Sequence, residues 1–375
     1  MTKNIFFLFF FLFSSNLLFS QIDTVEQKKN FIMKMFDAKD AAVILAPVIS
    51  RSPDTRLNFS LDFLRYFKSN KNDTNSVRTS HISAFVDYSL NNQFKIGGNW
   101  LIFFNEDKLQ SRGSIYFSDF PDVFYGVGNR SNKEDIESYS YSKVKMNGNI
   151  LKELGAKSFY LGGALRYHNY FNKDIDRAPL LNELNNLSPI QNEMMGVGVE
   201  FNIDKRDNFF YSKKGYFFSF SSMYHIPIFE NFREFTQTNI KFNKYFNIKN
   251  SQVIAFQFQS DFNFGEDIPF FELHAAGGSR ILRSYATNRY RDRNFIGTQV
   301  EYRFPLIWRL RGAVFTGVGE VFNQPNQVRM DYLKYSYGGG VRFVINKANM
   351  LQVRLDYGRG LGNSNVIYLG FGEAF

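Results

Sequence analysis

The sequence predicts an all-β protein, a transmembrane antiparallel β-barrel of about 16 strands, and three observations carry this prediction. Apolar and aromatic residues alternate with polar residues in many segments, as from Leu57 to Phe63. These segments run for about ten residues or more, the length that crosses a bilayer at a tilt. The first twenty residues have the features of a secretory signal peptide, which provides a route out of the cytoplasm.

Composition narrows the class of protein. The chain has 375 residues, 45 Phe, 21 Tyr and no Cys, and its mean hydropathy is −0.30. After the N-terminus no segment approaches roughly 18 consecutive apolar residues, which excludes a helical membrane protein. The net charge of +10 favours anionic partners, and for an exported chain these are outer-membrane lipid and lipopolysaccharide rather than nucleic acid. A generally basic proteome would give the same charge.

The N-terminal region divides into two expected parts. Residues 1–20 combine Lys3 with an apolar run from Ile5 to Phe13, so we expect a signal peptide cleaved after Ser20. An uncleaved membrane anchor is the alternative, although the apolar run is short for a span. Residues 21–41 then form a short periplasmic segment, and 42–375 form the barrel domain.

The predicted strands alternate apolar and polar faces along most of the chain. A soluble sandwich would alternate in the same way, but here the polar faces carry Gln, Asn, Asp and Arg, which suit a barrel lumen. An even number of strands places both chain ends in the periplasm. The long connections 119–137, 171–192 and 265–294 all follow odd-numbered strands and are therefore expected outside the cell. The predicted strands are 42–50, 55–67, 77–90, 93–104, 108–118, 138–151, 157–170, 193–203, 215–226, 233–246, 251–264, 295–305, 309–321, 332–346, 349–358 and 365–375.

A cluster of turn-forming residues separates the eighth and ninth predicted strands, in "DKRDNFFYSKKGYFFSF". Asp and Asn side chains can bond the local backbone, and a Gly permits a positive φ, so the cluster predicts a rigid periplasmic turn. It resembles the Asp-x-Arg-Asp-Asn…Pro-x-x-Gly turn of the BamA/TamA superfamily of outer-membrane assembly and two-partner secretion barrels. The matching residues are Asp204, Arg206, Asp207, Asn208 and Gly215, with Ser212 or Lys213 in place of the Pro.

The stretch "GGSRILRSYATNRYRDRN" interrupts the alternation with five arginines. It resembles the superfamily's loop that folds back into the barrel, through Gly277, Gly278, Arg283 and Tyr285, with Ser284 in place of a Gly. The resemblance implies a loop latched in the lumen. We expect Arg289, Arg291 and Arg293, which lie close to the next strand, to line the lumen or meet anionic headgroups.

A guanidinium inside a narrow barrel needs a carboxylate partner, because an unpaired buried charge is very costly. By alternation, Glu301 and Asp356 face the lumen, so we expect Arg283 to pair with one of them. The strand "GTQVEYRFPL" also resembles the superfamily. In "AVFTGVGEVF", Gly317 stands where the superfamily has Asp, and Glu320 is the candidate to replace that acid.

The last predicted strand ends in an aromatic residue. By alternation, Phe375 shares one face of the predicted strand with Ile367, Leu369 and Phe371. A terminal aromatic on an alternating strand resembles the signal that the bacterial outer-membrane insertion machinery recognises. We therefore expect Phe375 to belong to an insertion signal.

The resemblance implies a barrel in the outer membrane that inserts, assembles or translocates proteins, with β-augmentation at a weak seam between the first and last strands. Superfamily members normally carry periplasmic domains that residues 21–41 are too short to hold, so a separate periplasmic or surface partner or client is expected. The alternative is a plugged or anion-favouring pore, or a platform barrel.

No catalytic motif is present, so we expect no enzyme, and no cofactor or metal. The four His residues are scattered along the chain. His168 and His225 lie near predicted strand ends, where belt or loop positions explain them.

Overall fold

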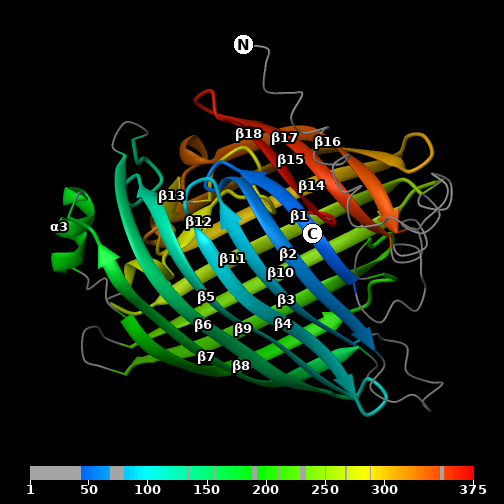
Figure 1. Ribbon diagram of the computed structural model, residues 1–375, viewed down its shortest axis with the longest axis horizontal. Coiled ribbons are helices and arrows are strands. Elements are labelled where there is room, and N and C mark those ends of the chain that lie inside the picture. The colour runs from blue at the N-terminus through cyan, green and yellow to red at the C-terminus, as the bar shows by residue number, and fades with distance from the viewer. Residues whose placement is uncertain are drawn as a thin grey trace, which may run out of the picture.

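The computed structural model shows a closed antiparallel barrel of sixteen strands, which confirms the predicted fold class (Figure 1). Its description covers residues 44–67, 80–132, 136–155, 158–176, 178–187, 192–208, 211–228, 234–249, 251–266, 268–287, 289–346 and 350–375. The predicted signal peptide, the segment 21–41 and residues 42–43 of the predicted barrel domain lie outside these residues.

The barrel strands follow one another around the wall in chain order, and β1 closes against β18. Their bounds are β1 Ile44–Ser52, β2 Arg56–Phe67, β3 Ser80–Ser89, β4 Phe94–Phe104, β5 Leu109–Phe124, β6 Glu137–Glu153, β7 Phe159–Asp174, β8 Asn192–Asp204, β9 Gly215–Pro227, β10 Phe235–Asn247, β11 Val253–Phe264, β14 Asn294–Pro305, β15 Leu310–Phe322, β16 Lys334–Asn346, β17 Leu351–Gly360 and β18 Asn365–Phe371. β11 pairs directly with β14, because the segment between them leaves the wall.

The alternation of side chains explains why the barrel closes. On β2 the side chains of Phe59, Leu61 and Phe63 point outward and are exposed, whereas the polar residues between them face inward. The same outward apolar surface recurs on the other strands. Closure gives every strand a neighbour on both sides, which limits the backbone edge left unpaired in a hydrocarbon environment to the seam between β1 and β18.

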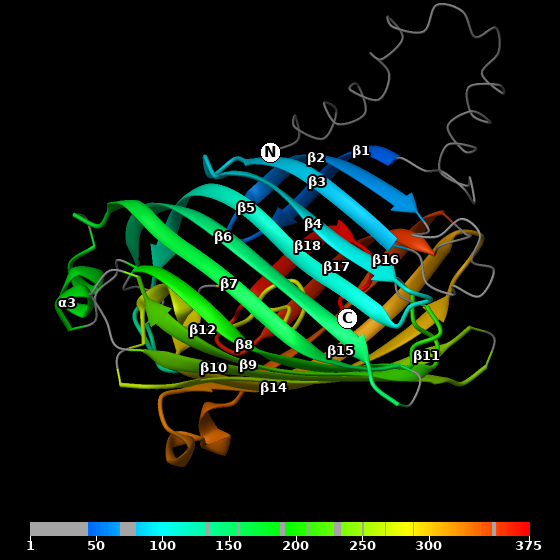
Figure 2. The same cartoon turned by 90° about the horizontal axis from the view of Figure 1, so that it is seen from below.

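The long connections carry the remaining structure. Helix α3 (Pro179–Leu187) lies between β7 and β8, and the 3₁₀ turns η3 (Pro325–Gln327) and η4 (Met330–Tyr332) lie between β15 and β16. Figure 2 shows this last segment, in orange, projecting away from the wall. In the described part of the chain no helix has both the length and the apolar character to span a membrane.

Several predicted strand ends differ from the structure. β5, β6 and β7 extend beyond the predicted ends at 118, 151 and 170, because their extra residues stay paired. The last strand stops at Phe371 rather than at 375, and the chain then turns at Gly372. Phe375 therefore does not share the outer face of β18, contrary to the prediction.

Candidate functional site in the barrel lumen

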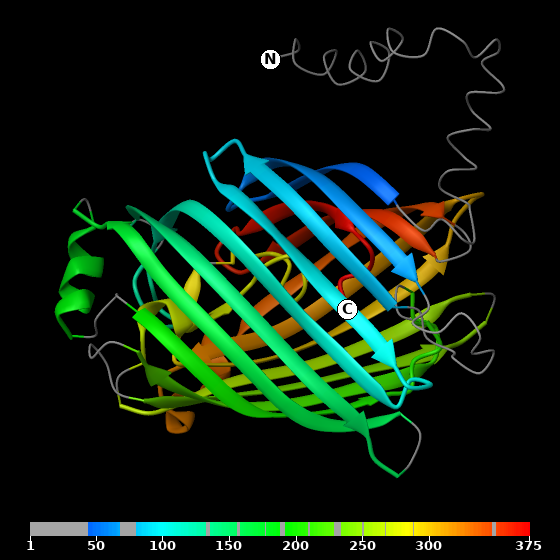
Figure 3. The ribbon, with the colours of Figure 1, turned by 60° about the horizontal axis from the view of Figure 1, so that its bottom comes forward.

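The connection between β11 and β14 folds into the lumen (Figure 3). It begins with the 3₁₀ turn η2 (Phe270–Glu272) and continues as the short strands β12 (His274–Ala276) and β13 (Tyr290–Asp292), which pair with each other. The tip of this hairpin lies between them. We call the segment 265–293 the inserted loop.

The base of the inserted loop packs against the wall formed by β5 to β8. Phe270 is 1% exposed and meets Tyr139 edge-on, with ring centroids 5.9 Å apart. Phe271 stacks on Tyr170 at 4.3 Å and lies 4.5 Å from the ring of Tyr141. These contacts, which we call the aromatic anchor, bury the rings in one cluster with residues from β5, β6, β7, β8 and β10.

One carboxylate sits within the aromatic anchor. Glu272 accepts hydrogen bonds from the hydroxyl of Tyr170 at 2.9 Å and from Nδ1 of His168 at 2.9 Å, and lies 3.3 Å from Nζ of Lys145. Burial acts to raise the pKa of Glu272, but Lys145 and His168 outweigh it and hold the pKa well below its ordinary value. The carboxylate is therefore charged and ties the loop to β6 and β7.

The hairpin tip turns sharply around the glycine pair. Gly277 has φ +114, and a Cβ there would approach the carbonyl oxygens of Tyr285 and Ala286 at 2.8 Å, so a larger residue does not fit. In the turn that follows, Leu282 has φ +50, whereas Ser284 is not among the residues of positive φ. The Ser in place of the superfamily's Gly is therefore compatible with the backbone at that position.

The tip presents Arg283 to the wall opposite the aromatic anchor. Its Nη2 lies 2.6 Å from a carboxylate oxygen of Glu301, as an ion pair rather than an aligned hydrogen bond, and its Nη1 donates to Asp356 at 2.8 Å. The guanidinium also lies 3.6 Å from the centroid of Phe315. All three charged side chains are 0% exposed. Arg283 thus contacts both of the carboxylates that sequence analysis named as alternatives.

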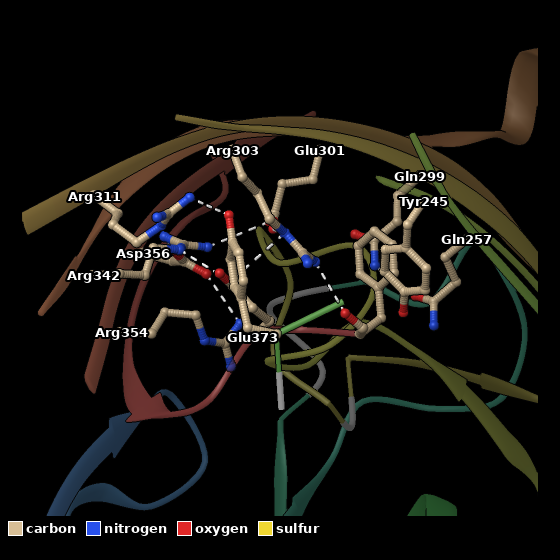
Figure 4. Close-up of polar contacts among 12 residues, drawn as sticks. Tyr245, Gln257, Gln299, Glu301, Arg303, Arg311, Arg342, Arg354, Asp356 and Glu373 are labelled. Carbon is tan, nitrogen blue, oxygen red and sulfur yellow. Dashed lines mark hydrogen bonds and ion pairs between the residues drawn. The ribbon is translucent and has the colours of Figure 1, made fainter. Parts of the chain in front are cut away.

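Three further arginines and one acid extend this cluster, as Figure 4 shows in part. Arg303 donates to Glu301 at 2.7 Å, and Arg342 donates to Asp356 at 2.5 Å. Arg354 donates to Asp356 at 3.0 Å, and Glu373 accepts from Arg342 at 3.1 Å. Four guanidiniums therefore surround three carboxylates, and we call the group Arg283, Glu301, Arg303, Arg342, Arg354, Asp356 and Glu373 the ionic anchor.

Tyr285 fixes the tip by hydrogen bonds to the neighbouring strands. Its hydroxyl donates to the carbonyl of Tyr335 at 2.9 Å and accepts the N–H of Leu361 at 2.9 Å. Its own carbonyl accepts the hydroxyl of Tyr368 at 2.8 Å. The predicted residues Gly277, Gly278, Arg283, Tyr285, Glu301 and Asp356 thus lie together at one wall.

The other arginines of the loop hold backbone carbonyls or rings. Arg289 donates to the carbonyl of Ser131 at 2.6 Å, and Arg293 to those of Gly265 and Glu266 at 2.8 Å. Arg291 lies 4.7 Å from the ring of Phe270. Each of these side chains braces a loop, and the expectation that the three arginines line the lumen or meet anionic headgroups stays a prediction.

The substitute acid proposed for Gly317 does not reach the cluster. Glu320 accepts a hydrogen bond from the amide of Asn129 at 2.9 Å, in the connection between β5 and β6. Glu373 supplies a third carboxylate to the ionic anchor instead. Alternation along 349–358 already places Arg354 on the inner face, but no periodic signal marks Glu373, which lies beyond the last strand.

The predicted periplasmic turn has the expected local bonds. Arg206 donates to Asp204 through Nε and Nη2, both at 2.8 Å, and Asp207 accepts the N–H of Lys213 at 2.9 Å. Asn208 accepts the N–H of Tyr211 at 2.9 Å. Gly215 has φ +97, and a Cβ there would clash with the carbonyl of Lys205. These bonds hold the turn in one conformation.

The turn and the last residues of the chain meet at the end of the lumen where β8 connects to β9. Tyr211 is buried against Tyr245, with Phe375 packed on the same cluster. Phe375 stacks on Tyr245 at 6.4 Å, and its carbonyl accepts a hydrogen bond from Arg303 at 3.0 Å. Arg303 therefore links the ionic anchor to residue 375.

The sequence suggested belt or loop positions for His168 and His225, but the structure places neither residue at such a position. Both are buried on the inner wall, and His225 stacks on Phe235 at 4.6 Å. Among the residues that the structure describes, no group of three or more His, Asp or Glu side chains is arranged to hold a metal ion. The arrangement positions and braces a loop.

Comparison with known proteins identifies the family of the chain. The Omp85 superfamily domain matches residues 101–375, well over half of the chain. BamA from Haemophilus ducreyi lacking POTRA domains 1–3 has a similar structure, with a TM-score of 0.58 at 13% identity over 88% of this chain and 70% of that one. CdiB from Acinetobacter baumannii has a TM-score of 0.55 at 12% identity, over 87% of this chain and 58% of that one. CdiB from Escherichia coli has a TM-score of 0.56 at 9% identity, over 91% of this chain and 68% of that one.

No curated protein sequence matches the chain. The structural similarities show the fold, and the superfamily domain covers the strands that carry the inserted loop and both of its anchors. The protein is therefore an outer-membrane β-barrel that belongs to the Omp85 superfamily.

Proposed function

We propose that this barrel inserts, assembles or translocates proteins at the outer membrane, together with a separate periplasmic or surface partner. The observation that carries the proposal is the seam between β1 and β18. Its ladder contains one residue pair, Arg51 with Leu369, in the described part of the chain. The neighbouring β17–β18 ladder runs from Val353–Phe371 to Arg359–Asn365.

A weak seam suits a strand-adding function. A client strand can pair with an edge once β1 and β18 separate, and main-chain hydrogen bonds then provide affinity without sequence specificity. Pro47 on β1 cannot donate a ladder hydrogen bond, which favours separation. The inserted loop supports the same function, because it braces the wall next to the seam through Asp356 on β17 and Tyr368 on β18, so β18 stays held when β1 separates from it.

A reversible cross-link tests this function. The chain has no Cys, so an Arg51→Cys and Leu369→Cys pair introduces the only thiols. Directly paired residues of antiparallel strands lie about 4.5–5.5 Å apart, which suits a disulfide. In cells that depend on this protein, oxidation of the pair should deplete other outer-membrane proteins, and reductant should restore them.

The matched control locks the adjacent ladder. Arg51→Cys with Leu57→Cys joins β1 to β2, which are paired along their whole length, and should leave client proteins at normal levels. If the seam disulfide forms quantitatively and the other outer-membrane proteins are unchanged, the proposal is wrong.

Conductance separates the proposal from a pore function. A barrel plugged by an anchored loop should show low conductance in planar bilayers. A wide, steady, anion-selective conductance of the unmodified protein, together with no effect of the seam cross-link on other outer-membrane proteins, would favour the pore.

A further inference from the structure

A row of lumenal side chains crosses β4, β5 and β6 near the aromatic anchor. The register pairs Lys95 with Ser118, and Ser118 with Lys143. The same face of β6 carries Lys145, whose ammonium meets Glu272 of the inserted loop, so the row faces the lumen. Two strand spacings separate the backbones of Lys95 and Lys143 by about 10 Å, which lets both side chains extend toward Ser118 on the strand between them.

The two lysines have aromatic neighbours but no acidic partner. Nζ of Lys95 lies 4.4 Å from the ring centroid of Tyr116, and Nζ of Lys143 lies 5.9 Å from the same centroid. Asp87 pairs with Lys95 in the strand register without forming an ion pair. Among the described residues neither ammonium forms an ion pair with a carboxylate, whereas Lys145 on the same face does.

Ser118 supplies an independent indication of a missing ligand. Its side chain is 0% exposed, and its hydroxyl oxygen has no hydrogen-bond partner. Buried polar groups are nearly always satisfied, and a lone buried hydroxyl costs free energy. In the strand register Ser118 lies between Lys95 and Lys143, and the one hydrogen bond that the Lys143 ammonium forms among the described residues goes to the neutral hydroxyl of Tyr141 at 3.4 Å.

Lys95, Lys143 and Ser118 all lack an anionic partner among the described residues. Two positive charges that approach a common ring repel each other, and attraction to aromatic faces offsets only part of the cost of partial burial. An oxyanion between them would accept from both ammoniums and from the hydroxyl. A phosphate monoester carries close to two negative charges at pH 7, because its second pKa is about 6, which matches two lysines that form no ion pair with a carboxylate among the described residues.

We infer that Lys95, Ser118 and Lys143 form a lumenal binding site for a phosphate dianion, free or carried on a small organic group. The lysines neutralise the charge, and Ser118 donates its hydroxyl hydrogen from the floor of the site. Tyr116 forms an aromatic wall beside it. The site adjoins the aromatic anchor, because Lys143 donates to the hydroxyl of Tyr141, and it does not depend on the proposed function.

Calorimetric titration of the purified full chain with inorganic phosphate at pH 7 tests the site. The wild type should bind one phosphate. Lys95→Met and Lys143→Met should each weaken binding by about tenfold or more, the loss expected for a charge-assisted hydrogen bond. Ser118→Ala makes a smaller structural change and should weaken binding less, which keeps the test valid if a lysine variant folds poorly.

The matched control is Lys241→Met on β10. Lys241 also faces the lumen, through its register pairing with Gln259, and its replacement removes the same charge from a different wall. It should leave phosphate affinity unchanged. Equal weakening by Lys241→Met and Lys143→Met would show diffuse attraction by a basic lumen and overturn the site, as would the absence of saturable binding to the wild type.

A second titrant distinguishes the sources of the phosphate. Glycerol 3-phosphate that binds more tightly than inorganic phosphate would assign the site to a phosphomonoester such as a lipid-headgroup fragment. Equal affinities would assign it to free phosphate. Failure of both to bind would overturn the proposal.

Discussion

The two walls of the barrel hold the inserted loop by different interactions. At the base, the rings of Phe270 and Phe271 are buried among tyrosines, and Glu272 is the carboxylate of this contact, paired with Lys145. At the tip, Arg283 enters a buried cluster of guanidiniums and carboxylates. Both contacts bury the loop in the lumen, but one uses apolar area and the other uses matched charge.

This difference determines how each anchor responds to change. Apolar contacts tolerate small shifts, since they have little directionality. A buried ion pair loses far more when one partner is removed, because the other charge stays desolvated. The aromatic anchor therefore holds the base of the inserted loop against the wall without fixing it in one position, and the ionic anchor fixes the position of the tip.

The largest expected effect is that of Arg283→Ala. It leaves Glu301 and Asp356 short of one guanidinium, and we expect the free energy of unfolding to fall by about 3–5 kcal/mol. The folded barrel should lose heat resistance on a semi-native gel, and urea unfolding followed by tryptophan fluorescence should give the magnitude.

A double-mutant cycle checks which residues are coupled. Arg283→Ala combined with Asp356→Ala should cost less than the sum of the two single changes. Asp261 on β11 makes contacts with Asn239 and Gln259 instead, so Arg283→Ala with Asp261→Ala should be additive. Strict additivity for Asp356 would mean that its pairing with Arg283 has no energetic weight.

Phe270→Ala should have the next largest effect. Truncating a fully buried Phe costs about 3–5 kcal/mol, and we expect the lower end because the loop can partly collapse onto Phe271. Phe270→Leu retains most of the volume and should cost much less. Equal losses for the two variants in urea unfolding would show that the edge-on ring contacts, rather than buried area, hold the base.

Glu272→Gln should have a smaller, pH-dependent effect. The pKa of Glu272 is depressed in the fold, so its contribution to stability is present above the unfolded pKa of about 4.3 and is lost as pH falls through the folded pKa. The wild type should lose more free energy of unfolding than Glu272→Gln as pH falls from about 5 to 3. Parallel curves for the two proteins would contradict the ion pairs assigned to Glu272.

Ser284→Gly should have the smallest effect. Since Ser284 is not at a positive φ, restoring the superfamily's Gly should destabilise by about 0.5–1 kcal/mol through added backbone entropy. A clear gain in heat resistance would instead reveal strain at the tip.

Much of the barrel could be predicted because alternation has a physical cause. A strand between lipid and a polar lumen must change character at every residue, so Phe59, Leu61 and Phe63 mark β2 directly. The end of β5 was missed because Phe124 there packs edge-on against Phe270 of the inserted loop, so aromatic side chains face inward as well as outward. Phe120 on the same strand packs against Tyr141 in that cluster.

The two anchors also differ in how far the sequence predicts them. Arg283, Glu301 and Asp356 could be named because a buried guanidinium requires an acid and alternation places both acids in the lumen. Phe270, Phe271 and Glu272 lie in a loop without periodicity, and their partners come from strands about 100 residues earlier. Glu373 follows the turn at Gly372, so the strand pattern gives no direction for its side chain.

Conductance in planar bilayers tests most directly whether the loop plugs the lumen from both walls. We predict low conductance for the wild type, a modest rise for Arg283→Ala or Phe270→Ala alone, and a wide, steady conductance when the two changes are combined. A wild type that already conducts widely, with no change in the double variant, would contradict a lumen plugged by a doubly anchored loop.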